Sequence, residues 1–200
     1  MRAATLGAAT IYEAAGRIGA LPSRIKPVDD SWRIAGPAFP VLTQPRNNVW
    51  IHDALEVAPK GSILVVDCGG YLEAGYWGDI MSTAATKLEL GGLVIDGGVR
   101  DIDSLRLIGF PVFSSAVAIH GTSKNREPTG TLGKDIYLGG VQISNGDLIV
   151  GDNDGVVVIP SSNAISAVRA GELREINEAE IRDRLRTGEL TLDIYGLREL

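Results

Sequence analysis

The feature that most constrains this fold is the pairing of short apolar runs with helix-like segments. Residues 63–66 form a continuous apolar run followed by Gly69-Gly70, and residues 93–95 form another followed by Gly97-Gly98. Runs of this length, closed by glycines, predict buried strands. Because segments with helical spacing separate them, the strands are expected to pair in parallel. The pattern therefore predicts an α/β core.

Helical spacing of apolar residues predicts four short helices in the first half of the chain. They are expected over residues 11–18, 50–57, 79–90 and 101–108, with Asn48 placed to cap the second. Residues 33–43 predict extended chain interrupted by a turn at 36–38, and Val112-Phe113 begins a third buried strand.

The second half has a different character. Residues 122–133 are rich in Gly, Pro, Thr and Asn and predict a long surface loop. Apolar runs near 141–143, 148–150 and 156–159, separated by Asn145-Gly146 and Asp154-Gly155, predict antiparallel hairpins. A long charged helix is expected from Ser161 or Ser162 to about Arg186. We expect one domain over residues 1–200, with 161–200 a C-terminal helical extension used in oligomer contacts.

Composition excludes several classes of function. A net charge of −6 argues against nucleic-acid binding, which needs a basic face. The single cysteine, Cys68, gives no disulfide framework and is expected to be a buried thiol at a strand end. No apolar run approaches the ~18 residues that a membrane span needs, and Glu13 and Arg17 interrupt any signal-peptide core. We therefore expect a cytoplasmic protein with no membrane partner.

Two junctions between a strand and a helix carry the residues suited to chemistry. The first, residues 75–79, ends in Asp79, and the second, residues 96–101, ends in Arg100 and Asp101. Parallel sheets bind ligands at the carboxyl ends of their strands, where helix N-termini favour anions. Carboxylates suit Mg²⁺ or Mn²⁺, and an arginine fork suits a substrate carboxylate. Both aspartates are also ordinary residues at the start of a helix, stabilised by its dipole.

Asp79 is followed, after twenty further residues, by Arg100-Asp101. This pattern is similar to the Asp-X20-Arg-Asp signature of the RraA-like family, which includes the 4-hydroxy-4-methyl-2-oxoglutarate / 4-carboxy-4-hydroxy-2-oxoadipate aldolases. Other segments resemble the family in the right order. They are IAGPA (34–38), GGLVIDGGVRD (91–101), FPVF (110–113), GGV (139–141), GD (146–147) and DNDGVVVIP (152–160).

The resemblance implies roles for these residues. The residue at Asp101 would bind the divalent metal directly, and Asp79 would hold metal-bound waters. Arg100 would bind the substrate and stabilise the pyruvate enolate. The backbone around Gly78, through the amides of Ile80 and Met81, would receive the pyruvyl carboxylate.

The resemblance also implies a site shared between subunits. Family members fold as a swivelling β/β/α domain, a central mixed sheet with flanking helices, and assemble as homotrimers or homohexamers. A glutamate from the C-terminal helix of a neighbouring subunit completes the site through water. Glu178 is the expected residue, with Glu175 and Glu180 as alternatives. Glu178 is equally suited to an ordinary i,i+4 pair with Arg182.

The predicted activity is that of a metal-dependent (class II) aldolase. It would cleave a 4-hydroxy-2-oxo acid to pyruvate and a second carbonyl compound, with oxaloacetate decarboxylation as a side activity. Two alternatives remain open. Some RraA-like proteins are protein-binding regulators of ribonuclease activity, and others are lyases acting on a different hydroxy acid.

Other residues are weaker candidates. The run 152–155 superficially resembles a calcium loop but predicts a hairpin turn. Lys87 would need a desolvated pocket to form a Schiff base. Trp77 either lines a pocket or packs in the core. Lys124 and Arg126, in the long loop, are either contacts for a distal substrate carboxylate or solvated charges.

Overall fold

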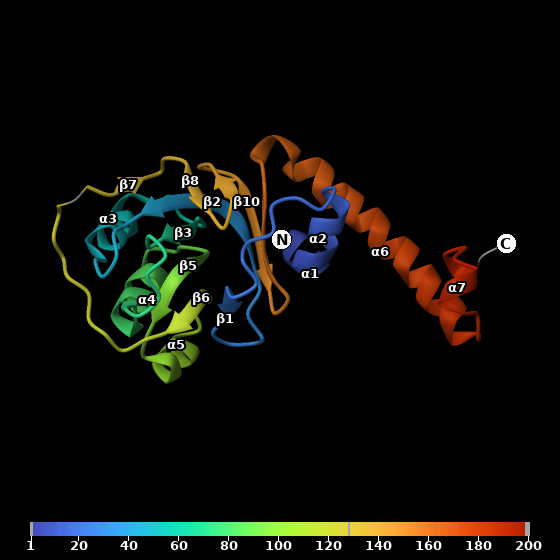
Figure 1. Cartoon of the computed structure of the whole chain (residues 1–200), viewed down its shortest axis with the longest axis horizontal. Coiled ribbons are helices and arrows are strands. Elements are labelled where there is room, and N and C mark those ends of the chain that lie inside the picture. The colour runs from blue at the N-terminus through green and yellow to red at the C-terminus, as the bar shows by residue number, and fades with distance from the viewer. Residues whose placement is uncertain (1, 128, 199–200) are drawn as a thin grey trace.

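A mixed β-sheet lies at the centre of this computed structural model, which describes residues 2–127 and 129–198 (Figure 1). The strands are β1 (Lys26–Pro27), β2 (Ile34–Leu42), β3 (Ile63–Asp67), β4 (Gly75–Trp77), β5 (Gly92–Val99), β6 (Val112–Val117), β7 (Thr131–Leu132), β8 (Ile136–Leu138), β9 (Val141–Ile143), β10 (Leu148–Asp152) and β11 (Gly155–Ile159). The α-helices are α1 (Arg2–Leu6), α2 (Ala8–Ala14), α3 (Val49–Val57), α4 (Asp79–Lys87), α5 (Ile102–Ile108), α6 (Ala164–Arg186) and α7 (Thr191–Ile194).

The middle of the sheet is parallel, as the sequence predicts. The main sheet has the order β1-β6-β5-β3-β2-β10-β11, and β2, β3, β5 and β6 pair in parallel. The short strand β4 also pairs in parallel with β5, beyond the end of β3. The carboxyl ends of β4 and β5 therefore lie at the same edge of the sheet, where α4 and α5 begin.

The end of the sheet that follows β2 is antiparallel and curls back towards β1. Strands β10 and β11 form a hairpin in which Asp152 is paired with Gly155, so the run 152–155 is the predicted turn. Lys26 of β1 donates a hydrogen bond of 2.6 Å to the backbone carbonyl of Asp154 in that turn. The curled sheet encloses an apolar cluster that includes Val65, Val94 and Phe113.

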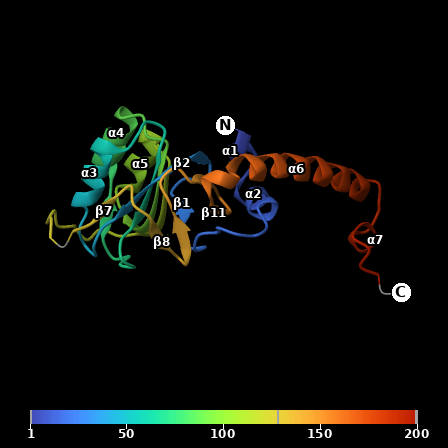
Figure 2. The same cartoon turned by 90° about the horizontal axis from the view of Figure 1, so that it is seen from above.

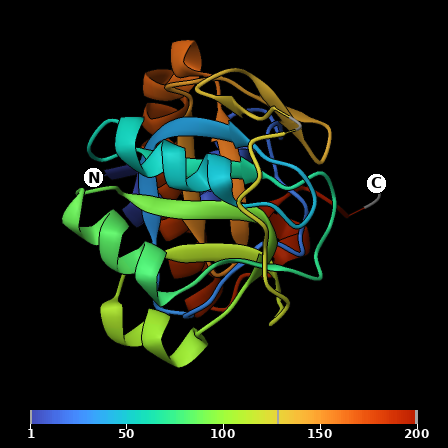
Figure 3. The same cartoon turned by 90° about the vertical axis from the view of Figure 1, so that its left-hand side faces the viewer.

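Helices cover the sheet on two sides (Figures 1 and 3). Helices α3, α4 and α5 lie on one face, over an apolar cluster that includes Val66, Ile95 and Leu105. Helices α1, α2 and α6 pack beside β10 and β11, around a smaller cluster that includes Ile11 and Ala167. The predicted architecture of a mixed sheet with flanking helices and a long C-terminal helix is confirmed.

The C-terminal part of α6 projects away from the rest of the molecule (Figures 1 and 2). Gly171 is buried near Leu6 and Ile11, but no described residue of 172–198 is buried. We refer to residues 172–198 as the arm. Its exposed apolar side chains include Leu173 and Ile176. No helix in the described part of the chain is long and apolar enough to cross a membrane.

The structure corrects two predictions about strands. Residues 36–38 are not a turn, because β2 runs unbroken from 34 to 42 and changes partner there, from β10 to β3. Strand β5 likewise does not end at residue 97. A Cβ on Gly97 would lie 2.8 Å from Cys68 Sγ, so this glycine permits close packing inside a continuous strand.

The predicted helix limits also need correction. The helix predicted over 11–18 corresponds to α2, which begins earlier, at Ala8, and ends at Ala14, before Ile18. Helix α1 was not predicted. Asn48 does not cap α3 through its side chain. Instead, Asn47 Oδ1 accepts a 3.1 Å hydrogen bond from the amide of Val49. A 3₁₀ turn over Ser161–Asn163 precedes α6, which has no side-chain cap.

Candidate active site

One cavity brings together the three residues on which the predicted chemistry depends. Asp79, Arg100 and Asp101 all line a space of about 280 Å³ at the carboxyl ends of β4 and β5. The predicted substrate-binding residues Gly78, Ile80 and Met81 also line it, and so do residues of α3 and of the loop after β6.

Asp101 is held in an unusual backbone conformation that turns its carboxylate towards α4. Its φ of 61° and ψ of 40° lie in the left-handed region, which is uncommon for residues other than glycine. The carboxylate makes no capping bond to its own helix α5. Its Oδ2 instead accepts a 3.3 Å hydrogen bond from the amide of Asp79 and lies 3.6 Å from Nε of Arg100. Capping of α5 therefore does not explain why an aspartate carboxylate is held at this position.

The glycines of the first junction make room for these side chains. A Cβ on Gly78 would lie only 2.3 Å from Asp101 Oδ2, and one on Gly75 would lie 3.1 Å from Cδ of Arg100. A larger residue at position 78 would push the Asp101 carboxylate away, and one at position 75 would first clash with the carbonyl of Ala118, at 2.6 Å, and would also crowd Arg100. The glycines thus serve the close approach of Arg100 and Asp101 to β4 and α4.

Asp79 begins α4 and lies beside the free amides of that helix. Its Oδ1 accepts a 2.7 Å hydrogen bond from the amide of Ile80, whose side chain is exposed. A substrate carboxylate binding the Ile80 amide would therefore replace Asp79 there. Helix N-termini stabilise anions, so this end of the cavity suits a carboxylate.

The other end of the cavity is formed by α3 and the loop after β6, which contribute Asn48, His52 and Lys124. Burial lowers the pKa of His52, and the nearby charge of Lys124 lowers it further, while Asp53 acts in the opposite sense. Asn48 donates a 3.0 Å hydrogen bond to the carbonyl of Tyr76, and its buried Oδ1 has no partner among the described residues. This end therefore presents the Lys124 cation and the His52 imidazole, with an unpaired acceptor buried beside them.

Asn48 and His52 were not predicted as site residues. Asn48 directly precedes α3, and His52 follows four positions later within the helix. That spacing is compatible with a shared site but is also common on buried helix faces. The packing of α3 against α4, and the hydrogen bond from Asn48 to Tyr76 in β4, bring both residues to Asp79. Lys124 was a candidate from sequence, and the structure places it at the cavity.

The predicted glutamate does not reach the cavity of its own chain. Glu178 lies on the arm, where Arg174 contacts it at 2.8 Å and Arg182 at 3.7 Å. The i,i+4 pair with Arg182 is thus present but longer than the pair with Arg174. Glu175 pairs with Arg182 at 2.7 Å, and Glu180 is exposed.

Other sequence candidates have structural roles. Trp77 is buried, stacks on Phe110 at 5.8 Å and donates a 2.6 Å hydrogen bond to Ser82, so it packs in the core. Cys68 is fully buried, as predicted, and burial raises the pKa of its thiol well above 9.0. Lys87 is the last residue of α4 and does not line the cavity.

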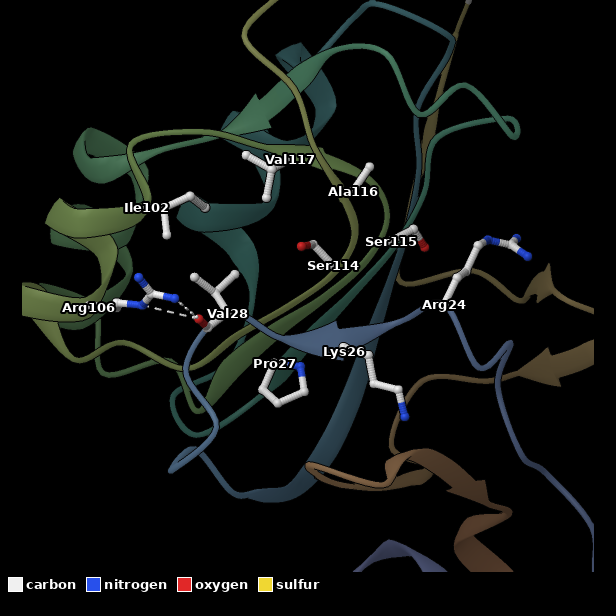
Figure 4. Close-up of a pocket in the computed structure, with 10 residues that line it drawn as sticks. All are labelled: Arg24, Lys26, Pro27, Val28, Ile102, Arg106, Ser114, Ser115, Ala116 and Val117. Carbon is white, nitrogen blue, oxygen red and sulfur yellow. Dashed lines mark hydrogen bonds between the residues drawn. The ribbon is translucent and has the colours of Figure 1, made fainter.

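A second hollow of about 300 Å³ lies beside β1 and β6, away from the predicted residues (Figure 4). Its three cations already have partners. Arg24 forms a bidentate pair with Asp96, Lys26 binds the carbonyl of Asp154, and Arg106 binds the carbonyl of Val28. The cavity at Asp101 is therefore the stronger candidate for an active site.

The donor set at the cavity fits a hard divalent cation with several waters. Two carboxylates, Asp79 and Asp101, converge there beside backbone amides. Within the described ranges, no three His, Cys, Asp or Glu side chains cluster as a metal site. Mg²⁺ retains several waters and needs only one or two protein carboxylates, so the residues present suit Mg²⁺ better than Zn²⁺.

Known proteins resemble this chain along most of its length. A protein of Halalkalibacterium halodurans named "Putative 4-hydroxy-4-methyl-2-oxoglutarate aldolase" is 32% identical over 180 residues, covering 90% of this chain and 84% of its own. An uncharacterized protein from Pseudomonas syringae has a solved structure with a TM-score of 0.77 and 29% identity, covering 91% of this chain and 88% of its own.

The RNA-processing inhibitor RraA from Thermus thermophilis has a TM-score of 0.68 and 25% identity, covering 76% of this chain and 91% of its own. Residues 8–158 match the model of the RraA-like family, described as Aldolase/RraA. That range contains β1 to β10, all of β11 except its last residue, and every residue lining the cavity. The chain therefore belongs to the RraA-like family.

Proposed function

We propose that this protein is a divalent-metal-dependent aldolase that cleaves a 4-hydroxy-2-oxo acid to pyruvate and a second carbonyl compound. Oxaloacetate decarboxylation is its expected side activity. The observation that carries the proposal is the convergence of Asp79, Arg100 and Asp101 on one cavity at the start of α4. The similarity to relatives named as aldolases supports the same reaction class.

The proposed metal is Mg²⁺ or Mn²⁺. Asp101 would bind it directly, and Asp79 would hold its waters. When bound, the cation polarises the 2-oxo group and favours negative charge on that oxygen. Two carboxylates without a cation would repel a substrate carboxylate, so a bound cation also makes the cavity receptive to an anion.

The remaining roles belong to the protein's own groups. The pyruvyl carboxylate would bind at the N-terminus of α4, beside Gly78, Ile80 and Met81. A base removes the proton of the 4-hydroxyl, the C3–C4 bond breaks, and its electron pair forms the enolate of pyruvate. Arg100, 3.6 Å from Asp101, would donate to the enolate oxygen as its charge develops. Protonation at C3 then gives pyruvate.

The arm is proposed to complete the site of a neighbouring subunit in a homotrimer or homohexamer. Glu178 lies on this part of α6, which contains no buried residue in the structure and carries exposed apolar side chains. Burying these side chains against another copy is favourable. In the assembled protein Glu178 would hold metal-bound water and contribute to catalysis, with Glu175 and Glu180 as alternatives.

Replacing the proposed metal ligand tests the function. Pyruvate release from 4-hydroxy-2-oxoglutarate is measured with Mg²⁺ for the wild type, Asp101→Asn and Asp103→Asn. Asp103 is a matched control because it lies two positions away with its side chain 99% exposed. We expect Asp101→Asn to lose roughly a hundredfold or more in kcat/KM, and Asp103→Asn to stay within about twofold. Equal activities in all three proteins would contradict the proposal.

A second candidate function is binding and regulation of a ribonuclease. It is favoured by the similarity to a structure described as an RNA-processing inhibitor. Capture of a ribonuclease by the pure protein, without metal-dependent pyruvate release, would support this function over lyase activity. Ribonuclease regulation would assign no role to the acidic and basic residues that line the cavity, so we rank this function second.

A further inference from the structure

The loop that follows β6 lines one side of the cavity, and hydrogen bonds hold it against the segment before α3. We refer to residues 121–127 as the strap. The amide of Ser123 donates a 2.7 Å hydrogen bond to the carbonyl of Arg46, and the carbonyl of Ser123 accepts one of 3.2 Å from Asn48. The side chain of Asn47 donates to the carbonyl of Asn125. The strap therefore follows the segment that leads into α3 (Figure 3).

The strap has one charged anchor on α3 itself. Arg126 binds Asp53 through two parallel hydrogen bonds of 2.6 and 3.0 Å. Its guanidinium also lies 5.9 Å from the ring centroid of Trp50, one turn earlier on the same helix. The pair holds the pKa of the Asp53 carboxyl below its usual value. Such bidentate pairs fix orientation better than single contacts do.

Helix α3, which carries Asp53, is held in place by its packing on the core. Ile51 and Ala54, on its other face, are fully buried in the core beneath the helix. His52 precedes Asp53 and lines the cavity. The anchor therefore fixes the strap relative to the same helix turn that forms one wall of the site.

Lys124 is the residue that the anchor places at the cavity. It lines the cavity two positions before Arg126, and it lies near enough to His52 to lower that residue's pKa. Arg126 is neutralised by Asp53, whereas Lys124 makes no ion pair with any described residue. One strap cation thus serves as an anchor, and the other faces the space where a ligand would lie.

We propose that the Asp53–Arg126 pair is a positioning device, which holds the strap so that Lys124 binds an anionic group at the end of the substrate remote from its 2-oxo acid. The two ends of the cavity then have separate tasks. The end at Asp79, Arg100 and Asp101 takes the 2-oxo acid, and the end at Lys124 selects a ligand with a second negative charge. This inference rests on the proposed function for the orientation of the ligand.

The test compares two unreactive probes of equal chain length. 2-Oxoglutarate carries a distal carboxylate where 2-oxopentanoate carries a methyl group, and neither has the 4-hydroxyl that cleavage needs. Affinities for both are measured calorimetrically with Mg²⁺ for the wild type, Lys124→Met, Arg126→Met and the exchanged pair Asp53→Arg/Arg126→Asp. Hydrogen exchange of the strap amides is followed in the same proteins.

The matched control is Lys60→Met. Lys60 forms an exposed ion pair of 2.8 Å with Glu89 and is not among the residues that line the cavity. Like Arg126→Met, this change removes one cation from a surface ion pair. It should alter neither the preference between probes nor exchange in the strap.

We expect the wild type to prefer 2-oxoglutarate, and Lys124→Met and Arg126→Met each to reduce that preference about fivefold. Affinity for 2-oxopentanoate should stay within about twofold. Strap exchange should rise in Arg126→Met alone, and the exchanged pair should restore both properties. Equal weakening of both probes by Arg126→Met, or no change in either property, would overturn the inference. Because no step depends on turnover, an inactive wild type would sink the proposed aldolase activity and still leave this result readable.

Discussion

Asp101 adopts a backbone conformation that an L-residue enters at a cost of roughly 1 kcal/mol or more. The left-handed geometry directs its carboxylate to the amide of Asp79 instead of to the amides of α5. Strained residues persist where the surroundings fix them, and here Gly78 leaves the space that the carboxylate occupies. The conformation thus places the carboxylate where the proposed metal would bind.

The substitution Gly78→Ala adds one methyl group and tests whether the Asp101 carboxylate depends on the space at Gly78. The added Cβ would fall 2.3 Å from Asp101 Oδ2, so the carboxylate must move by about an ångström. A shift of that size can cost roughly a hundredfold in kcat. The change should weaken Mg²⁺ binding in calorimetry and lower pyruvate release, while the thermal midpoint remains close to that of the wild type. Unchanged metal affinity would mean that Asp101 is not the ligand.

The elements of the core could be predicted largely from local patterns, but the ends of the elements could not. The runs at 63–66 and 93–95 were recognisable because parallel strands are buried on both faces. Strand β4 has only three residues and no alternation. Residues 36–38 resemble a turn locally, yet pairing with two different neighbours holds them extended.

The residues of the candidate site also divide into those that local sequence indicates and those that it does not. The strand–helix junctions made Asp79, Arg100 and Asp101 candidates from local sequence, but only the family resemblance gave them their expected roles over an ordinary place at a helix start. Asn48 and His52 reach the cavity only because α3 packs against α4, and the strap brings Lys124 there through contacts between distant segments. No local pattern encodes those contacts.

The arm makes a prediction about assembly at the level of a single element. If Glu178 serves a neighbouring cavity, Asp101→Asn and Glu178→Gln impair different halves of a shared site. Each variant alone should lose roughly tenfold or more in kcat. Oligomers formed from an equal mixture should regain about a quarter of wild-type activity, because about one interface in four pairs two intact halves.

This complementation is measured after the two purified variants are unfolded and refolded together. Refolding each variant alone provides the baseline. Glu175→Gln and Glu180→Gln, tested in the same way, identify which glutamate of the arm takes part. A mixture no more active than the mean of the two variants would show that Glu178 does not complete a neighbour's site.

For the whole molecule, the free energy of unfolding should depend on pH in the alkaline range, because the core buries two weakly acidic side chains. Burial raises the pKa of the Cys68 thiol well above 9.0 and the pKa of Tyr76 from 10.0 to about 12. The folded chain therefore keeps protons that the unfolded chain releases above these ordinary values. Stability should be full below about pH 9 and should fall as pH rises through the region from 9 to 12.

Cys68→Ala isolates the thiol's share of this dependence. The variant should be less stable at neutral pH by about 1 kcal/mol, because it leaves a small cavity in the core. Its unfolding midpoint in urea should nevertheless fall less steeply between pH 9 and 10 than that of the wild type. Parallel curves for the two proteins would show that the thiol does not contribute.

The central claim is that the cavity at Asp101 performs metal-dependent cleavage, and metal removal and return tests it most directly. The protein is treated with a chelator, dialysed and assayed for pyruvate release from 4-hydroxy-2-oxoglutarate before and after addition of Mg²⁺ or Mn²⁺. We predict that release stops without metal and returns on addition, and that Asp101→Asn fails to recover at the same metal concentration. Undiminished release from the metal-free protein, or no release under any condition, would contradict the account.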